Sequence, residues 1–143
     1  MSEPGCIFCA IVADQAERSI VYEDGLTLAF MDLTPVAPGH LLVVPKTHAA
    51  ALADLDATIG GAVMQTAMRC ATALRRSPLR TDGINLFLAD GVAAGQEVFH
   101  VHLHVLPRFP GDGFGLRIDY DEPPTRSTLD THAAAISAVF DLG

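Results

Sequence analysis

Hydrophobic and polar positions alternate most regularly between residues 100 and 106. Every second position there is a histidine (His100, His102 and His104), and the positions between and after them are valine or leucine. Strict alternation is typical of a strand with one buried face. Successive side chains on a strand point to opposite faces, so the three imidazoles are expected on one face and the aliphatic side chains in the core. We therefore predict a strand within the run 95–108.

Four other stretches have the composition of strands. Asp24-Gly25 is a turn signal between two β-rich runs and predicts a hairpin. The next run is almost entirely apolar and is bounded by Gly39 and Pro45, which predicts a central strand. The last stretch, residues 84–89, is expected to pair with the histidine strand across a long loop. These strands are expected over residues 19–22, 26–31, 40–44 and 84–89.

Two segments have helical periodicity. Residues 52–76 carry apolar side chains at the i, i+3 and i+4 spacing of one helix face, with Asp54 or Asp56 able to cap the first turn. Pro78 then ends this long helix. Near the C-terminus, residues 127–130 resemble a capping arrangement, and a short amphipathic helix is expected after them.

Composition indicates one globular domain over residues 1–143. Half of the residues are hydrophobic and 18% are charged. No apolar run reaches membrane-spanning length, and the first residues lack the features of a secretory signal, so we expect a cytoplasmic protein without a membrane partner. The net charge of −8 argues against nucleic acid as a partner. A small phosphate-bearing ligand is still compatible, because it responds to the local field of its site.

The chain has three cysteines, an odd number that argues against a disulfide framework. Cys6 and Cys9 form a C-x-x-C pair, which can bind a metal or act as a redox couple. Redox pairs usually follow a strand, and none precedes this pair, which favours a metal. Two further ligands would have to be histidines. Cys70 lies on the apolar helix stripe and is expected to be a buried structural thiol.

The three alternating histidines leave several kinds of chemistry open. Each ring must find partners for two nitrogens, which makes such a row costly for packing alone. A metal cluster, a nucleophilic or acid–base site, or both would explain it. Two roles are also open for Asp32. A side chain that bonds its own turn is the commoner role, and a carboxylate that accepts hydrogen bonds from a diol is the functional alternative.

Residues 100–106 resemble the His-φ-His-φ-His-φ-φ signature of the histidine triad (HIT) superfamily, in which φ is apolar. Residues 94–96 before this stretch and 107–108 after it also resemble the family pattern. Residues 32–48 resemble its second characteristic block. With Cys6-x-x-Cys9, these blocks resemble the zinc-containing bacterial members of the family.

This resemblance covers about residues 6–108 and leaves 109–143 as a C-terminal extension. It implies an α+β fold with an antiparallel sheet of about five strands, one long helix and a short C-terminal helix, usually as a homodimer. It also implies a nucleotide-binding hydrolase or nucleotidyl transferase. Such an enzyme attacks the α-phosphate of a purine nucleoside phosphoramidate or a dinucleoside polyphosphate through a covalent nucleotidyl-histidine.

Individual roles follow from the same resemblance. His102 corresponds to the nucleophile, and His104 and Gln96 correspond to residues beside the phosphate. Asp32 corresponds to the carboxylate on the ribose hydroxyls, and His40 to a histidine behind the active site that is hydrogen-bonded to the triad.

The resemblance also implies a metal site. Cys6, Cys9, His48 and His100 correspond to the ligands of a structural zinc with no open position. Two alternatives to the nucleophilic enzyme are a metal-dependent enzyme, in which the three triad histidines bind one catalytic ion, and a non-catalytic nucleotide-binding adaptor.

Two positions depart from the family pattern. Ala89 stands where many members have an asparagine. Glu97 stands where some phosphoramidases have serine or threonine near the leaving group. Both departures bear on the substrate rather than on the nucleophile.

Overall fold

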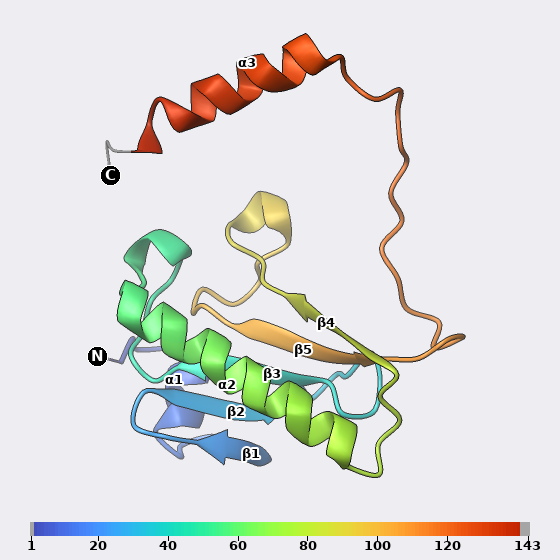
Figure 1. Ribbon diagram of the computed structural model, residues 1–143. Helices are drawn as coiled ribbons and strands as arrows, with labels where there is room; N and C mark the ends of the chain where they lie inside the picture. Colours follow the sequence, from blue (N-terminus) through green and yellow to red (C-terminus); the bar gives the residue numbers. More distant parts are fainter. Residues whose placement is uncertain (1, 141–143) are drawn as a thin grey trace.

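Five antiparallel strands form one sheet in the order β1-β2-β3-β5-β4 (Figure 1). A computed structural model describes residues 2–140; residues 1 and 141–143 of the expected domain lie outside this range. The strands are β1 (Ile20–Glu23), β2 (Thr27–Met31), β3 (Leu41–Pro45), β4 (Gly83–Phe87) and β5 (Leu103–Arg108). The helices are α1 (Ile7–Val12), α2 (Ala57–Arg76) and α3 (Arg126–Ser137), with 3-10 turns at Leu52–Asp54 and Val92–Ala94.

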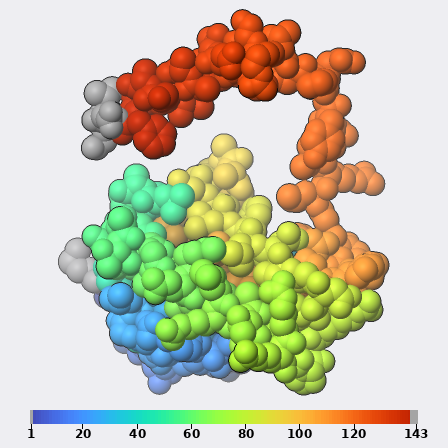
Figure 2. Space-filling model, viewed as in Figure 1, coloured from blue at the N-terminus to red at the C-terminus, as the bar shows by residue number. Residues whose placement is uncertain are grey.

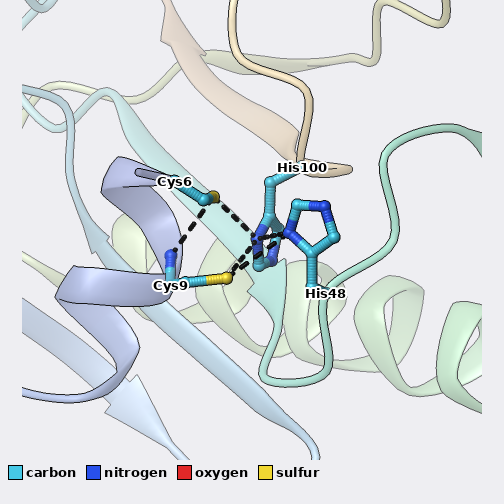
Figure 3. Close-up of side chains that lie close together, drawn as sticks. All are labelled: Cys6, Cys9, His48 and His100. Carbon is cyan, nitrogen blue, oxygen red and sulfur yellow. Dashed lines mark hydrogen bonds between the residues drawn. The ribbon is translucent and has the colours of Figure 1, made fainter. Parts of the chain in front are cut away.

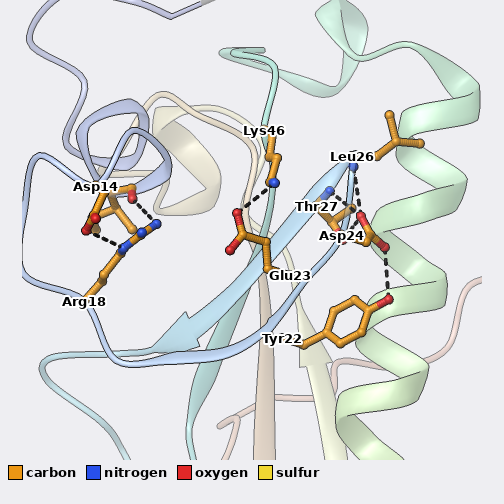
Figure 4. Close-up of polar contacts among 9 residues, drawn as sticks. Asp14, Arg18, Tyr22, Glu23, Asp24, Leu26, Thr27 and Lys46 are labelled. Atoms are coloured by element: carbon orange, nitrogen blue, oxygen red, sulfur yellow. Dashed lines mark hydrogen bonds and ion pairs between the residues drawn. The ribbon is translucent and has the colours of Figure 1, made fainter.

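This architecture confirms the predicted α+β class, the β1–β2 hairpin and the central position of β3. The hairpin turn is held by Asp24, whose Oδ1 accepts hydrogen bonds from the backbone amides of Leu26 and Thr27 at 2.9 and 2.8 Å (Figure 4). Lys46, just after β3, forms a 2.8 Å ion pair with Glu23 of β1. These polar contacts therefore help to hold β1, β2 and β3 in register at this end of the sheet.

The sheet is covered on both faces, which explains why every residue of β3 is buried. Leu41 and Val43 pack in a core with α2, and Leu42 and Val44 pack in a second core with α1. In Figure 1, α2 crosses one face of the sheet and α1 lies behind it. A strand that is buried on both faces has a continuous apolar sequence, and β3 has such a sequence.

The long helix begins later than its periodicity indicates. Asp56 is the N-cap of α2, and its Oδ1 accepts hydrogen bonds from the amides of Thr58 and Ile59. Residues 52–54 form a separate 3-10 turn, and Leu55 has an extended backbone that interrupts the helical path. The predicted apolar stripe is otherwise correct, and Cys70 on it is buried.

The histidine strand is shorter than its alternation predicts. β5 begins at Leu103, so His100 and His102 lie in the irregular segment before it. The ladder with β3 ends at the pair Val43–Leu103. Beyond it, the amide of Val101 bonds to the carbonyl of Ala49 at 2.8 Å instead of to a strand. Before β5, the backbone therefore bonds to the loop after β3 and not to a strand. This lets the side chain of His100 point away from His104.

Gly39 sets the start of β3 and the place of His40. Its φ of +95° is in the region that favours glycine. A Cβ at this position would lie 3.0–3.2 Å from side-chain atoms of Leu74, Leu79 and Pro107. Both backbone conformation and space therefore require glycine here.

The C-terminal part of the chain stands apart from the sheet. Residues 115–125 contain no helix or strand, and α3 is capped by Thr125, whose hydroxyl accepts a hydrogen bond from Thr128. The cap is thus upstream of the predicted 127–130 arrangement. Figures 1 and 2 show this segment arching away from the rest of the molecule. No helix within residues 2–140 combines the length and apolar character needed to cross a bilayer.

Candidate active site and metal cluster

A cavity of about 400 Å³ opens on the α1 side of the sheet. This volume lies within the range of small-molecule sites. Its walls combine apolar side chains with the polar groups predicted for the site. They include Ile7, Phe30, Asp32, Glu97, His102 and His104. The cavity therefore brings together residues from α1, the end of β2 and the start of β5.

His102 is held in a single tautomer. Its Nδ1 lies 2.8 Å from the carbonyl oxygen of His100. A carbonyl only accepts hydrogen bonds, so Nδ1 carries a proton, and the lone pair of the neutral ring is on Nε2. The ring of Phe8 packs edge-on against the imidazole, with centroids 5.0 Å apart, and His102 is 8% exposed. The ring is thus fixed in orientation, and in its neutral form the lone pair is on Nε2.

A chain of hydrogen bonds fixes the tautomer of His104 as well. The backbone amide of Val36 donates to Nδ1 of His40 at 3.1 Å, so the proton of a neutral His40 ring is on Nε2. That Nε2 lies 2.9 Å from Nδ1 of His104 and donates to it. The free N–H of His104 is therefore on its Nε2. The hydrogen bond predicted between His40 and the triad is present.

Burial keeps this pair neutral. Burial, together with the neighbouring rings of His102 and His40, lowers the pKa of His104 to about 4. Burial also lowers the pKa of His40, an effect that the nearby carboxylate of Asp32 partly opposes. Both imidazoles are therefore uncharged near pH 7, as the hydrogen-bond chain requires.

Asp32 holds the turn after β2 and also lies in the wall of the cavity. Its Oδ1 accepts a hydrogen bond from the amide of Thr34 at 2.8 Å, which forms the turn after β2. Its Oδ2 lies 3.4 Å from Nε2 of His40, and the residue lines the cavity. One oxygen thus holds the turn, and the other faces the histidine pair.

Gln96 lies outside the cavity, contrary to the predicted contact with the phosphate. The residue is buried, and its Oε1 accepts a hydrogen bond from the amide of Gly91 at 2.7 Å. Its Nε2 donates to the carbonyls of Ala50 and Val98 at 2.8 and 3.1 Å. The amide is therefore used to fold the loop between β4 and β5. Spacing in the sequence could not show that the side chain turns inward.

The four predicted metal ligands converge on one point beside the cavity (Figure 3). Sγ of Cys6 lies 3.4 Å from Nδ1 of His100, and Sγ of Cys9 lies 3.4 Å from Nδ1 of His48. The two Nδ1 atoms are 3.3 Å apart. A tetrahedral zinc ion with ordinary bond lengths would separate such nitrogen and sulfur atoms by about 3.3–3.6 Å. The spacing and chemistry of the donors therefore fit a tetrahedral metal.

Local structure explains how these ligands meet. Cys6 is the N-cap of α1, a short helix that was not predicted from the sequence, and Cys9 lies in its first turn. Nε2 of His100 lies 2.8 Å from the carbonyl of Pro45, which puts the proton there and leaves Nδ1 free to bind a metal. His100 thus belongs to this cluster, and His104 belongs to the group around His40. This division argues against one ion bound by all three triad histidines.

Fold and site together define a histidine-triad domain with an adjoining Cys₂His₂ cluster. The HIT domain family matches residues 13–111, and the chain belongs to this family. An uncharacterised HIT-like protein of Borreliella burgdorferi is 44% identical over 113 residues, covering 78% of this chain and 81% of that protein.

Two solved structures extend the comparison. A HIT family protein from Bacillus anthracis has a TM-score of 0.90 and 34% identity, over 98% of this chain and all of that one. A zinc-bound histidine triad family protein from Mycobacterium smegmatis has a TM-score of 0.75 and 39% identity, over 94% of this chain and 97% of that one.

Proposed function

We propose that this protein is a nucleotide hydrolase or nucleotidyl transferase in which Nε2 of His102 attacks the α-phosphorus of a purine nucleoside phosphate derivative. The observation that carries the proposal is the hydrogen bond from Nδ1 of His102 to the carbonyl of His100. In the neutral ring it places the proton on Nδ1 and leaves the lone pair on the attacking Nε2, and it supports the positive charge that develops on the ring. A neutral imidazole held in this way is a competent nucleophile near pH 7.

In the first step, a bond forms between His102 Nε2 and phosphorus, and the bond from phosphorus to the leaving group breaks. Nε2–H of His104 donates to a non-bridging phosphate oxygen and stabilises the negative charge there. In the second step, water attacks phosphorus, the bond to Nε2 breaks with its electron pair returning to the nitrogen, and the water releases a proton to solvent. The products are a nucleoside monophosphate and a neutral His102.

The cavity has suitable places for the rest of a nucleotide. Asp32 lines it with a carboxylate that can accept hydrogen bonds from ribose hydroxyls. Ile7 and Phe30 offer apolar surface for a purine base. Gln96, in this proposal, acts only by shaping the loop that precedes the triad.

Glu97 favours a phosphoramidate as the substrate. Its carboxylate lines the same cavity as His102, on the rim shared with a second surface depression. A negative side chain there attracts a protonated amine leaving group and repels the additional phosphates of a dinucleoside polyphosphate. The alanine at position 89 supplies no polar contact to the sugar or phosphate.

We further propose that the Cys₂His₂ cluster holds a structural zinc ion. Its donor set leaves no position for substrate, so the ion would tie α1 and its flanking residues to the segment that carries His102. The zinc-bound relative from Mycobacterium smegmatis supports this assignment. Thiolate ligands need reduced cysteines, which fits a cytoplasmic protein. We also propose that the protein works as a homodimer.

Turnover and adduct formation test the proposed reaction. The purified protein and a His102→Ala variant are incubated with an adenosine phosphoramidate and with a diadenosine polyphosphate. AMP release and intact protein mass are then followed. We expect AMP and a transient nucleotidyl adduct in the parent protein and neither in the variant, with equal zinc content in both. Nucleotide binding without release from either substrate would favour the adaptor function, and loss of zinc with His102 would contradict the assigned ligands.

A further inference from the structure

The cavity has two charged residues that the proposed reaction does not use. Glu17 and Arg18, here called the charged end, come from the segment between α1 and β1 and line the same cavity as His102 and His104. In the sheet, β2 and β3 lie between β1, which these two residues precede, and β5, which carries His104. The charged end therefore lies across the cavity from the triad histidines.

Backbone pairing fixes the position of the charged end. The amide of Met31 donates to the carbonyl of Ser19 at 2.9 Å, which places the segment before β1 beside the end of β2. Asp32 follows at that end, and its Oδ2 lies 3.4 Å from Nε2 of His40, which bonds to His104. From β1 to β5 there are three strand spacings, or about 14 Å. This is close to the length of an extended nucleoside monophosphate.

The wall between the two ends offers apolar surface to a flat ring. Ile7 and Leu33 line the cavity and are 49% and 83% exposed, and the buried Phe30 lines it as well. Apolar side chains in the wall of a concave site, with a few polar groups, are typical of a small-molecule site. A purine bound on this wall, with its ribose at Asp32, would direct its outer edge to the charged end.

Arg18 is held in place and still has a donor to offer. Its Nε donates to Oδ1 of Asp14 at 3.0 Å, and its Nη1 donates to the carbonyl of Ile11 at 2.9 Å. The side chain is 16% exposed. These bonds leave Nη2 without a partner among residues 2–140. A guanidinium that is already oriented loses little rotamer freedom when it binds a further acceptor.

Glu17 adds acceptors at the same end. The residue is exposed, and its carboxylate forms no hydrogen bond or ion pair with the rest of the described chain. An ionised carboxylate only accepts hydrogen bonds and can bind two adjacent donors side by side. The charged end therefore combines one oriented donor with a pair of acceptors.

This combination matches the outer edge of guanine. Guanine carries the acceptor O6 and, next to it, the donors N1–H and N2–H, so Arg18 can donate to O6 while Glu17 accepts from both nitrogens. Adenine offers a single donor, its 6-amino group. The lone pair of its N1 would face the carboxylate of Glu17 and be repelled.

We propose that Glu17 and Arg18 read the outer edge of the base and make the cavity select guanosine derivatives over adenosine derivatives. The proposal rests on the purine nucleotide site of the proposed function and specifies its base. It depends neither on attack by His102 nor on the leaving group. Binding without turnover can therefore test it, and the two proposals can fail separately.

Calorimetric binding of three nucleoside monophosphates tests the selection. The full chain is titrated with GMP, with IMP, which lacks the 2-amino group, and with AMP. We expect GMP to bind about tenfold more tightly than AMP, as hydrogen bonds to charged groups imply, and IMP to lie between them. Equal affinities would overturn the selection of guanine and leave the proposed reaction standing. Binding of none of the three would overturn both proposals, because they share one nucleotide site.

A matched pair of variants tests the role of Glu17. Glu17→Ala removes the pair of acceptors, and Glu122→Ala removes an exposed carboxylate outside the cavity. We expect the preference for GMP over AMP to fall to within about twofold in the first variant and to persist in the second, because only the first loses hydrogen bonds to the base. A preference that persists in Glu17→Ala would overturn the role of this residue. Thermal unfolding would check that both variants are folded.

Arg18→Gln separates the reading of O6 from a structural role. GMP and IMP both carry O6, so we expect both to bind at least about threefold more weakly, while AMP binding changes little. The ratio of the GMP and IMP affinities should stay the same, since Glu17 still reads the 2-amino group. Equal weakening of all three nucleotides would show that Arg18 only supports the fold, and this would overturn its role in base selection.

Discussion

His40 donates a hydrogen bond from Nε2 to Nδ1 of His104 across 2.9 Å, from the residue just before β3 to the second residue of the neighbouring strand β5. The amide of Val36 sets the direction of this bond by donating to the other nitrogen of His40. The backbone of one loop therefore determines which nitrogen of His104 presents a proton to the cavity. In the proposed reaction, this proton is the one that stabilises the phosphate oxygens.

Replacing His40 by phenylalanine should lower kcat more than it raises KM. The variant keeps an aromatic ring but removes the donor to His104, whose tautomer is then free to change. We expect kcat to fall about 100-fold, at the low end of the loss caused by removing one oriented donor. Steady-state kinetics would measure this, with His132→Gln on the exposed α3 as a control. A pure KM effect would show that His40 acts on binding and not on the orientation of His104.

Acidification should destabilise the protein through His104. Burial holds its pKa at about 4, against about 6.5 for an unperturbed histidine. Between these pH values the unfolded chain binds more protons than the folded one. This contribution to stability is therefore complete above about pH 6.5 and is lost as pH falls through about 4. Urea unfolding from pH 7 to pH 4.5 would measure the slope, which should be shallower in His104→Gln. An equal slope in both proteins would assign the effect to other groups, such as the metal ligands.

The three cysteines should separate cleanly into ligands and a core residue. Cys9→Ser should lose bound zinc and reduce the free energy of unfolding on the order of 3 kcal/mol, the stabilisation from a ligand at about 100 times its Kd. Cys70→Ala provides the matched control. It removes a buried sulfur at a cost of about 1 kcal/mol and should leave one zinc per chain. Elemental analysis and thermal unfolding would check both, and equal zinc loss in the two variants would contradict the ligand assignment.

Gly39→Ala should destabilise the fold by about 1–3 kcal/mol. The added Cβ would meet three side chains in a backbone conformation that costs a non-glycine residue energy. Gly61→Ala on α2 is the contrasting control, because open space surrounds that position and alanine is the better helix former. Denaturant midpoints should move in opposite directions. A neutral Gly39→Ala would show that the turn before His40 can adjust.

The sequence alone determined the parts of this protein that depend on local periodicity. The apolar run of β3, the Asp24-Gly25 hairpin, the stripe of α2 and the histidine signature are all visible in the order of residues. Each depends on which side chains must be buried and how often they recur. The family resemblance then grouped Cys6 and His100 as ligands of one metal cluster, and the structure places them together.

Tertiary structure decided the rest, because it depends on contacts between segments far apart in the chain. The alternation of the triad predicted one common face, but backbone partners from the loop after β3 turn His100 to the cysteines and leave His104 with His40. Gln96 looked like a phosphate ligand, yet three backbone groups of neighbouring loops take its amide. The fold places a backbone carbonyl or amide next to each histidine, and this group determines which ring nitrogen carries the proton. A polar side chain can serve a site or a loop, and only the distribution of hydrogen-bond partners in space decides between them.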